Sequence, residues 1–333
     1  MQDKSSNYVI GSLKKFDDVT QKFYQLSGGC LQSTPPSLDR CKLFTPILPL
    51  AHPIHRQTYS QWKYSMFVNT MFRRKRGRTL YLLPIGPFPD SVTATEVAGL
   101  SLWEFLRDFA SAFFHGLDVR VLLPEVPLEN INCTKRVHEN TNQTQVLVGD
   151  LFPFLQKMCP PDGHSVVGIS WTDLYPSEDL NFVLGEASFV QHSAAISFGR
   201  FEPKLYKDGQ RVRECGSEGE DEKAVMLLKL VKSLCHESCH LMGLAHCVFF
   251  QCLMNESSSM EQAFQQPMFL CPVCLRKLQK ICRFDIRERY LVLREMLLKC
   301  REAVESQYFA DSAEWLDRCL SFLDNADEEE FRS

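Results

Sequence analysis

The chain has 333 residues, 44% of them apolar and 23% charged, which is the composition of a globular protein rather than a disordered or fibrous one. Its 37 Lys and Arg residues oppose 41 Asp and Glu residues, and the net charge of −4 argues against extensive wrapping of nucleic acid. No apolar run approaches the ~18 residues that a membrane span needs, and the N-terminus lacks the apolar core of a secretory signal. We therefore expect a soluble, intracellular, monomeric protein that contacts neither membrane nor nucleic acid.

The first 78 residues read as an irregular extension, because prolines between Pro35 and Pro53 break any long helix. The extension ends in the basic run Arg73–Arg78, which we interpret as a solvated linker, with a nuclear-import or polyanion-binding patch as the alternative. We expect the protein to be located in the cytoplasm, and the basic run makes a nuclear location the alternative.

From Thr79 onward, apolar strand-like runs alternate with helical spacings. This order predicts a mixed sheet covered by helices, an α+β (mixed α/β) fold. The expected strands are 79–86, 118–124, 165–170, 181–189 and 194–201, and the expected helices are 95–117, 150–158 and 224–243.

The chain has fourteen cysteines, a large number for a protein expected in a reducing compartment. Clustered thiols there more often indicate metal binding or redox chemistry than disulfides. Half of them lie between Cys235 and Cys282. The scattered remainder is interpreted as small buried hydrophobic residues: Cys30, Cys41, Cys133, Cys159, Cys215, Cys300 and Cys319.

The helix predicted over 224–243 carries an apolar stripe on one side and His236 and His240 on the other, one turn apart. Two imidazoles one helical turn apart can bind a single metal ion. The side chain of Glu237 points to one side of them, where it can act as a base for a metal-bound water rather than as a ligand. Gly243 can end the helix with a positive φ, after which His246 can supply a third nitrogen. Three protein ligands leave one position open, which is typical of a catalytic zinc.

A second constellation follows at once, with the spacing C-x4-C-x18-C-x2-C. Four thiolates fill the coordination sphere of zinc, so this pattern indicates a structural site on Cys247, Cys252, Cys271 and Cys274. Redox-active or buried thiols are the alternative reading. Cys235 and Cys239 flank the histidines and are interpreted as packing or oxidation-sensitive thiols rather than as ligands.

The strings HESCHLMGLAHC, CLM and CPVC together resemble the archaemetzincins, over about residues 79–292. The resemblance implies a metzincin-like zincin catalytic domain over 79–300, with a twisted mixed sheet and an active-site helix, and a helical C-terminal tail over 301–333. It also implies that Met254 forms an apolar floor beneath the catalytic metal. The residue roles that it implies are catalytic zinc on His236, His240 and His246, general base at Glu237, and structural zinc on Cys247, Cys252, Cys271 and Cys274.

The function implied is zinc metallopeptidase, a hydrolase with two zinc ions per chain in which Glu237 takes a proton from a zinc-activated water. An edge strand within 181–189 could pair with an extended peptide substrate. The alternative is a catalytically weak zinc protein that serves as a scaffold or interaction surface. The sequence does not separate an aminopeptidase from an endopeptidase, although the resemblance favours short peptides.

Overall fold

The computed structural model describes residues 9–25, 43–47, 57–72, 77–201, 222–304 and 306–325. The chain divides into two compact units. The sheet unit comprises 75–242 and 298–309, and the helical unit comprises 1–74, 243–297 and 310–333. The predicted segments 1–78, 79–300 and 301–333 stay a prediction. Most of the basic run, Arg73 to Arg76, lies outside the described residues. Within the described ranges, no helix has both the length and the apolar character needed to cross a membrane.

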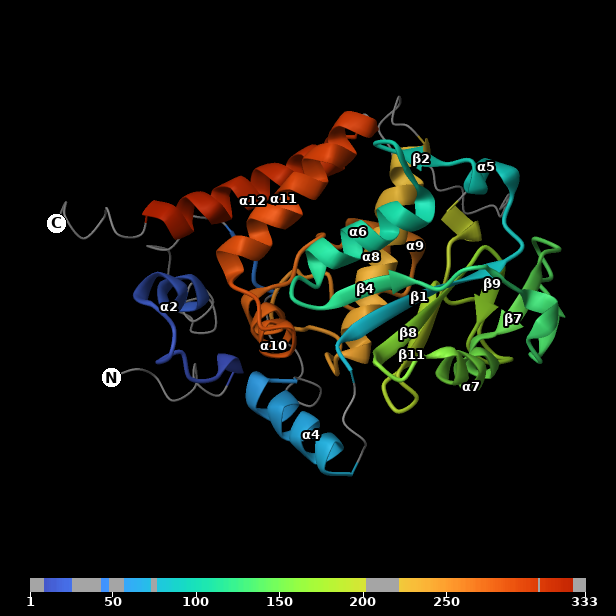
Figure 1. Cartoon of the computed structure of the whole chain (residues 1–333), viewed down its shortest axis with the longest axis horizontal. Helices are drawn as coiled ribbons and strands as arrows, with labels where there is room; N and C mark the ends of the chain where they lie inside the picture. Colours follow the sequence, from blue (N-terminus) through green and yellow to red (C-terminus); the bar gives the residue numbers. More distant parts are fainter. Residues whose placement is uncertain are drawn as a thin grey trace. The chain divides into compact units, whose positions relative to one another are not determined.

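A six-stranded sheet forms the centre of the sheet unit (Figure 1). Its strand order is β10-β11-β8-β1-β4, with β5 also paired to β1, and every pairing is parallel except that of β10 with β11. The mixed sheet is therefore confirmed, and β10 is its edge strand, inside the predicted range 181–189. The strands are β1 Thr79–Gly86, β4 Asp118–Val121, β5 Val126–Pro127, β8 Gly163–Ser170, β10 Gly185–Ser188 and β11 Ser193–Ser197.

Helices cover both faces of this sheet, which explains why β1 is buried along its full length. Helices α6 (Leu102–Phe113) and α8 (Glu222–Leu241) lie on one face, and α7 (Val148–Met158) lies on the other (Figure 1). Leu83 of β1 and Leu155 of α7 belong to one buried apolar cluster. The sequence thus predicted the layers correctly.

The predicted helix 95–117 is shorter than expected, because its first part is a hairpin of β2 (Glu96–Val97) and β3 (Leu100–Ser101). Its turn uses Gly99, whose φ of 77° is the left-handed conformation that glycine adopts without strain. Ser101 then begins α6 by forming a capping box with Glu104. The predicted strands 118–124, 181–189 and 194–201 are likewise present in shortened form.

A second, three-stranded sheet in the same unit was not predicted. It has the order β6-β7-β9, with β6 and β7 antiparallel and β7 and β9 parallel. The strands are Lys135–Val137 (β6), Thr144–Leu147 (β7) and Asp173–Tyr175 (β9). The remaining short elements are α5 Asp90–Thr93 and the 3-10 turns η2 Leu128–Asn130 and η3 Gly199–Phe201.

The helical unit contains helices from both ends of the chain. Residues 1–78 are not irregular throughout, because they include α2 and α4. Trp62 of α4 is buried, whereas Tyr64 and Phe67 of the same helix are exposed. Near the C-terminus, the Trp315 indole N–H donates to the Leu43 carbonyl at 2.8 Å, and its ring stacks on Phe269. Its helices are α2 Asp18–Gln25, α4 Tyr59–Phe72, α9 Met260–Gln265 and α10 Pro272–Cys282, together with most of α11 Ile286–Ala303 and α12 Gln307–Asn325. The end of α11 and the start of α12 belong to the sheet unit.

Candidate active site and metal centres

Helix α8 presents the first pair of predicted ligands. Its apolar stripe, which includes Leu227 and Leu234, is fully buried and fixes the rotation of the helix. His236 and His240 lie one turn apart, with their Nε2 atoms 3.0 Å from each other. Two nitrogens at ~2.0–2.1 Å from a tetrahedral zinc ion are about 3.3 Å apart, so the spacing of this pair fits the ion.

The third predicted ligand follows the end of α8. The helix ends at Leu241, and Gly243 has a φ of 78°, the left-handed conformation that commonly terminates helices. His246 follows three residues later, in the helical unit, and its place as the third ligand beside His236 and His240 stays a prediction.

Glu237 lies in the same turn of α8 as the histidine pair and is buried, with 9% of its surface exposed. Burial, with a smaller contribution from the negative charge of Glu186, raises the pKa of Glu237 to about 8. A general base works best when its pKa lies near the operating pH, and a bound divalent cation would lower this pKa from its metal-free value. The carboxyl group is thus suited to both accept and return a proton.

Glu186 and Gly185 are functional candidates that the sequence analysis missed. Both lie on the edge strand β10, and burial raises the pKa of Glu186 above its usual value. Neither residue belongs to a motif, and only the pairing of β10 with β11 brings them near α8. The prediction of an edge strand in this range was the one sequence signal that could have led to them.

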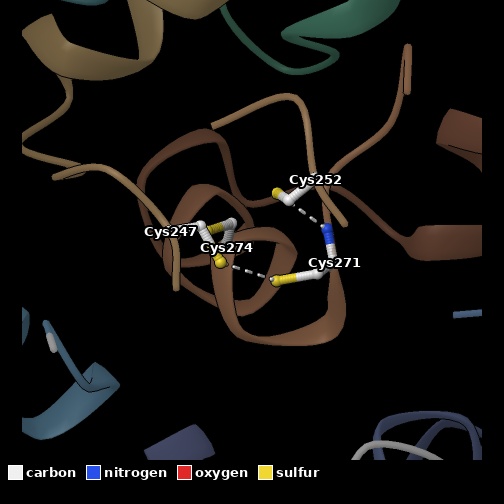
Figure 2. Close-up of side chains that lie close together, drawn as sticks. All are labelled: Cys247, Cys252, Cys271 and Cys274. Carbon is white, nitrogen blue, oxygen red and sulfur yellow. Dashed lines mark hydrogen bonds between the residues drawn. The ribbon is translucent and has the colours of Figure 1, made fainter. Parts of the chain in front are cut away.

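The four predicted cysteines come together in the helical unit (Figure 2). Their Sγ atoms lie within 4.8 Å of one another, and all four side chains are buried. The Sγ atoms of Cys247 and Cys271 are 3.6 Å apart, close to the ~3.8 Å expected between two sulfurs bound to one tetrahedral zinc. The donor set and its spacing fit a closed zinc site.

Hydrogen bonds hold the loop that carries Cys247 and Cys252. Asn255 accepts from the Cys252 N–H at 2.7 Å and donates to the carbonyls of Cys247 at 2.7 Å and Phe250 at 2.9 Å. The Cys247 N–H donates to the Met254 carbonyl at 2.7 Å. Asn255 is therefore a supporting residue of this site, which the sequence analysis did not identify because asparagine is not a usual zinc ligand.

Helix α10 supplies the other two thiols. Cys271 is its N-cap residue, Pro272 is the first helical residue, and Cys274 lies in the first turn. The Cys271 N–H donates to Sγ of Cys252 at 3.2 Å. Hydrogen bonds from the neighbouring thiols lower the pKa of Cys247, whereas burial raises the pKa of Cys252 and Cys271. The neighbouring thiols thus favour the thiolate form of Cys247 in the metal-free protein.

The remaining cysteines fall outside these groups. Cys235 and Cys239 are buried in α8 and belong to neither ligand group among the described residues, in line with a packing role. Of the scattered cysteines, Cys300 and Cys319 are buried, and burial raises the pKa of Cys300 to about 12. Cys133 and Cys159 are half-buried, and Cys30, Cys41 and Cys215 lie outside the described residues. Met254 is fully buried, but its place beneath a catalytic metal stays a prediction.

Comparison with known proteins gives the family. Residues 101–280 match Peptidase family M54. The chain is 31% identical to archaemetzincin-2 of Macaca fascicularis, over 84% of this chain and 88% of that protein. It is 34% identical to archaemetzincin-2 of Homo sapiens, over 73% of this chain and 69% of that protein.

Among solved structures, the chain is similar to archaemetzincin from Methanopyrus kandleri, with 22% identity and a TM-score of 0.44, over 64% of this chain and 99% of that one. The resemblance inferred from the motifs is confirmed by the family match and by the identity to the archaemetzincin-2 proteins. The chain belongs to peptidase family M54 and is an archaemetzincin-type zinc metallopeptidase.

Proposed function

We propose that this metallopeptidase hydrolyses peptides at a zinc ion held by His236, His240 and His246, with Glu237 as general base, and that a second zinc ion on Cys247, Cys252, Cys271 and Cys274 is structural. The observation that carries the proposal is the position of Glu237, a buried carboxyl group in the same helical turn as two imidazoles whose Nε2 atoms converge. A purely structural metal site has no use for such a carboxyl group.

Zinc, when bound, supplies Lewis-acid polarisation of the scissile carbonyl and of the attacking water. Glu237 takes the proton of that water and delivers it to the leaving amine, which is general acid–base catalysis typically worth ~10²–10⁴ in rate. The three histidines would hold the metal, and they must be neutral to do so. Among the described strands, β10 pairs only with β11, and its other edge is proposed to offer backbone hydrogen bonds to an extended peptide.

The four-cysteine site leaves no ligand position for chemistry, since four thiolates complete a tetrahedron. Its proposed role is to brace the segment that begins at Cys247, directly after His246. An intracellular location is part of the same proposal, because a reducing compartment keeps thiols available as ligands.

The test compares the wild-type protein with Glu237→Gln, using metal analysis and digestion of a peptide library. We expect the wild type to bind two zinc ions and cleave peptides, and the variant to keep both ions but lose at least about a hundredfold in kcat/KM. Glu129→Gln, on the exposed turn η2, is the matched control and should leave activity unchanged. A zinc-loaded wild type that cleaves no peptide would favour the alternative, a zinc scaffold or interaction protein.

A further inference from the structure

The segment that leads into the edge strand, residues 178–184, is held by side chains of the small β6-β7-β9 sheet and of η3. Three residues contact this segment, namely Arg136, Gln145 and Arg200, and Asp173 links the last two. We call these four residues the clamp. None of them belongs to either zinc motif, and the catalytic proposal above does not use them.

Arg136 donates to three main-chain carbonyls of the segment. Its Nη1 lies 3.1 Å from the Glu178 oxygen, and its Nη2 lies 2.6 Å from the Leu180 oxygen and 3.0 Å from the Asn181 oxygen. The guanidinium group also stacks on Tyr175 of β9, 3.9 Å from the ring centroid. Such a fork needs the planar, multidentate geometry of arginine, which lysine cannot reproduce.

A buried ion pair anchors the other end of the clamp. Arg200 donates to both carboxylate oxygens of Asp173, at 2.7 Å each, and its guanidinium lies 3.9 Å from the centroid of the Phe182 ring. The two side chains are only 8% and 0% exposed. Breaking such a pair leaves an uncompensated buried charge, so its geometry is strongly enforced.

Gln145 joins the two ends. It donates to Asp173 Oδ2 at 2.7 Å and to the Asn181 carbonyl at 2.8 Å, and it accepts from Nε of Arg136 at 2.8 Å. The clamp is thus one continuous network, and Gln145 and Asp173 are fully buried within it. Buried networks with every partner satisfied rigidify the backbone that they contact.

The clamped segment continues directly into the active-site side of the sheet. The Val183 N–H donates to the Leu174 carbonyl at 2.9 Å, and the Leu184 carbonyl accepts from the Ser197 N–H at 2.8 Å. The next residue is Gly185, the first of β10, which lies against the side chain of Glu237. No stretch of loose chain separates the clamp from the strand.

We propose that the clamp is a positioning device: Arg136, Gln145, Asp173 and Arg200 set the place of β10 relative to Glu237 and thereby align the peptide that pairs with this edge. This inference rests on the proposed function, since it assumes that substrate pairs with β10. A displaced strand weakens the binding of extended peptides, because each added residue of the substrate relies on another strand contact. The chemistry at Glu237 changes less, because α8 is held by its own apolar stripe.

The test uses Arg136→Lys, which keeps the positive charge and removes the fork. The matched control is Arg120→Lys, on the opposite edge strand β4, where the arginine pairs with the exposed Asp118 at 2.6 Å. Steady-state kinetics are measured on peptides from two to about eight residues long. Hydrogen exchange of the amides in 182–188 and zinc content are measured on the same samples.

For Arg136→Lys we expect KM to rise about tenfold for the longest peptides and less than about twofold for the shortest, with kcat within about twofold of wild type. Exchange in 185–188 should be faster, zinc content unchanged, and the control variant like wild type. An equal loss over all peptide lengths, or unchanged exchange, would overturn the proposal.

Phe182→Leu provides a second variant in case Arg136→Lys does not fold. It removes the ring beneath Arg200 and no hydrogen bond, so the same effects should appear at smaller size. Hydrogen exchange requires no turnover, so it reports whether the clamp holds β10 in place even if the wild type were to cleave no peptide. A wild type that cleaves no peptide would refute the proposed function, and the peptide digest shows this independently of hydrogen exchange.

Discussion

The edge strand and the proposed catalytic base are in direct contact through Gly185 and Glu237. A Cβ atom added to Gly185 would lie 2.8 Å from Cγ of Glu237, a distance that real Cβ atoms do not tolerate. Glycine at this position therefore lets β10 approach the carboxyl side chain as closely as the backbone permits. The strand proposed to bind substrate therefore lies directly against the group proposed to activate water.

Gly185→Ala should move Glu237 or the strand, because the added methyl group would also lie 2.9 Å from Cγ2 of Ile196 and 3.2 Å from the Ala195 carbonyl oxygen. We expect kcat/KM to fall by about tenfold or more and the free energy of unfolding by about 1–3 kcal/mol, the usual cost of overpacking. Zinc content should stay unchanged. Kinetics, thermal unfolding and metal analysis measure these three quantities.

Gly149→Ala is the control for that variant, since a Cβ atom at this position in α7 meets nothing within 4 Å. Alanine is the better helix former, so this change should leave activity unaltered and stability equal or slightly higher. Wild-type kinetics for Gly185→Ala would show that the contact with Glu237 has no catalytic importance.

Glu186→Gln should shift the pH dependence of activity. The negative charge of Glu186 contributes to raising the pKa of Glu237, so its removal lowers that pKa. Glu237 must be ionised to act as base and is ionised above its pKa, so the acid limb of the kcat/KM profile should move to lower pH. Glu139→Gln, an exposed change, should not move the acid limb. A shift of the limb to higher pH would contradict this electrostatic account.

Loss of a ligand should affect the two metal sites differently. Cys271→Ala should remove one zinc equivalent and lower the melting temperature strongly, because structural zinc binding contributes folding free energy. His240→Ala should also remove one equivalent and abolish activity, but with a smaller change in melting temperature. Cys282→Ala, a buried cysteine outside the four-cysteine group, should keep both ions. Retention of both ions in Cys271→Ala would show that the four-cysteine assignment is wrong.

Asn255→Ala should weaken the four-cysteine site without removing a ligand. The change deletes the hydrogen bonds that join Asn255 to the backbone of Cys247, Phe250 and Cys252. Supporting residues of this kind typically account for ~10–100-fold in metal affinity, and we expect a loss of that size in competition with a zinc chelator. Gln265→Ala, at an exposed position of α9, should leave the affinity unchanged.

The sequence predicted best those features that depend on local spacing. His236 and His240 are one helical turn apart on any α-helix, and the apolar run of β1 is recognisable because both faces of that strand are buried. Helix α4 was missed because its apolar residues, such as Trp62 and Phe67, are spread around the helix and form no single stripe.

Features that depend on pairing between distant segments could not be read from the sequence. Strands β7 and β9 have four and three residues and are separated by the whole of α7 and β8, so neither has a pattern long enough to identify it. The clamp follows from that pairing, and the contact of Gly185 with Glu237 follows from the pairing of β10 with β11. The clamp and the Gly185–Glu237 contact both join residues that are far apart in the sequence, and a single sequence does not show which distant residues will be in contact.

Cys271 occupies the N-cap of α10 without a side-chain hydrogen bond to the helix, in the place where serine or aspartate usually satisfies the first amides. The start of a helix carries partial positive charge, which favours the negative sulfurs gathered there. Zinc loading and the ordering of the first turn of α10 are therefore expected to be a single event. If so, chains that lack this zinc would have a disordered start of α10, and zinc-starved cells are expected to degrade more of the protein.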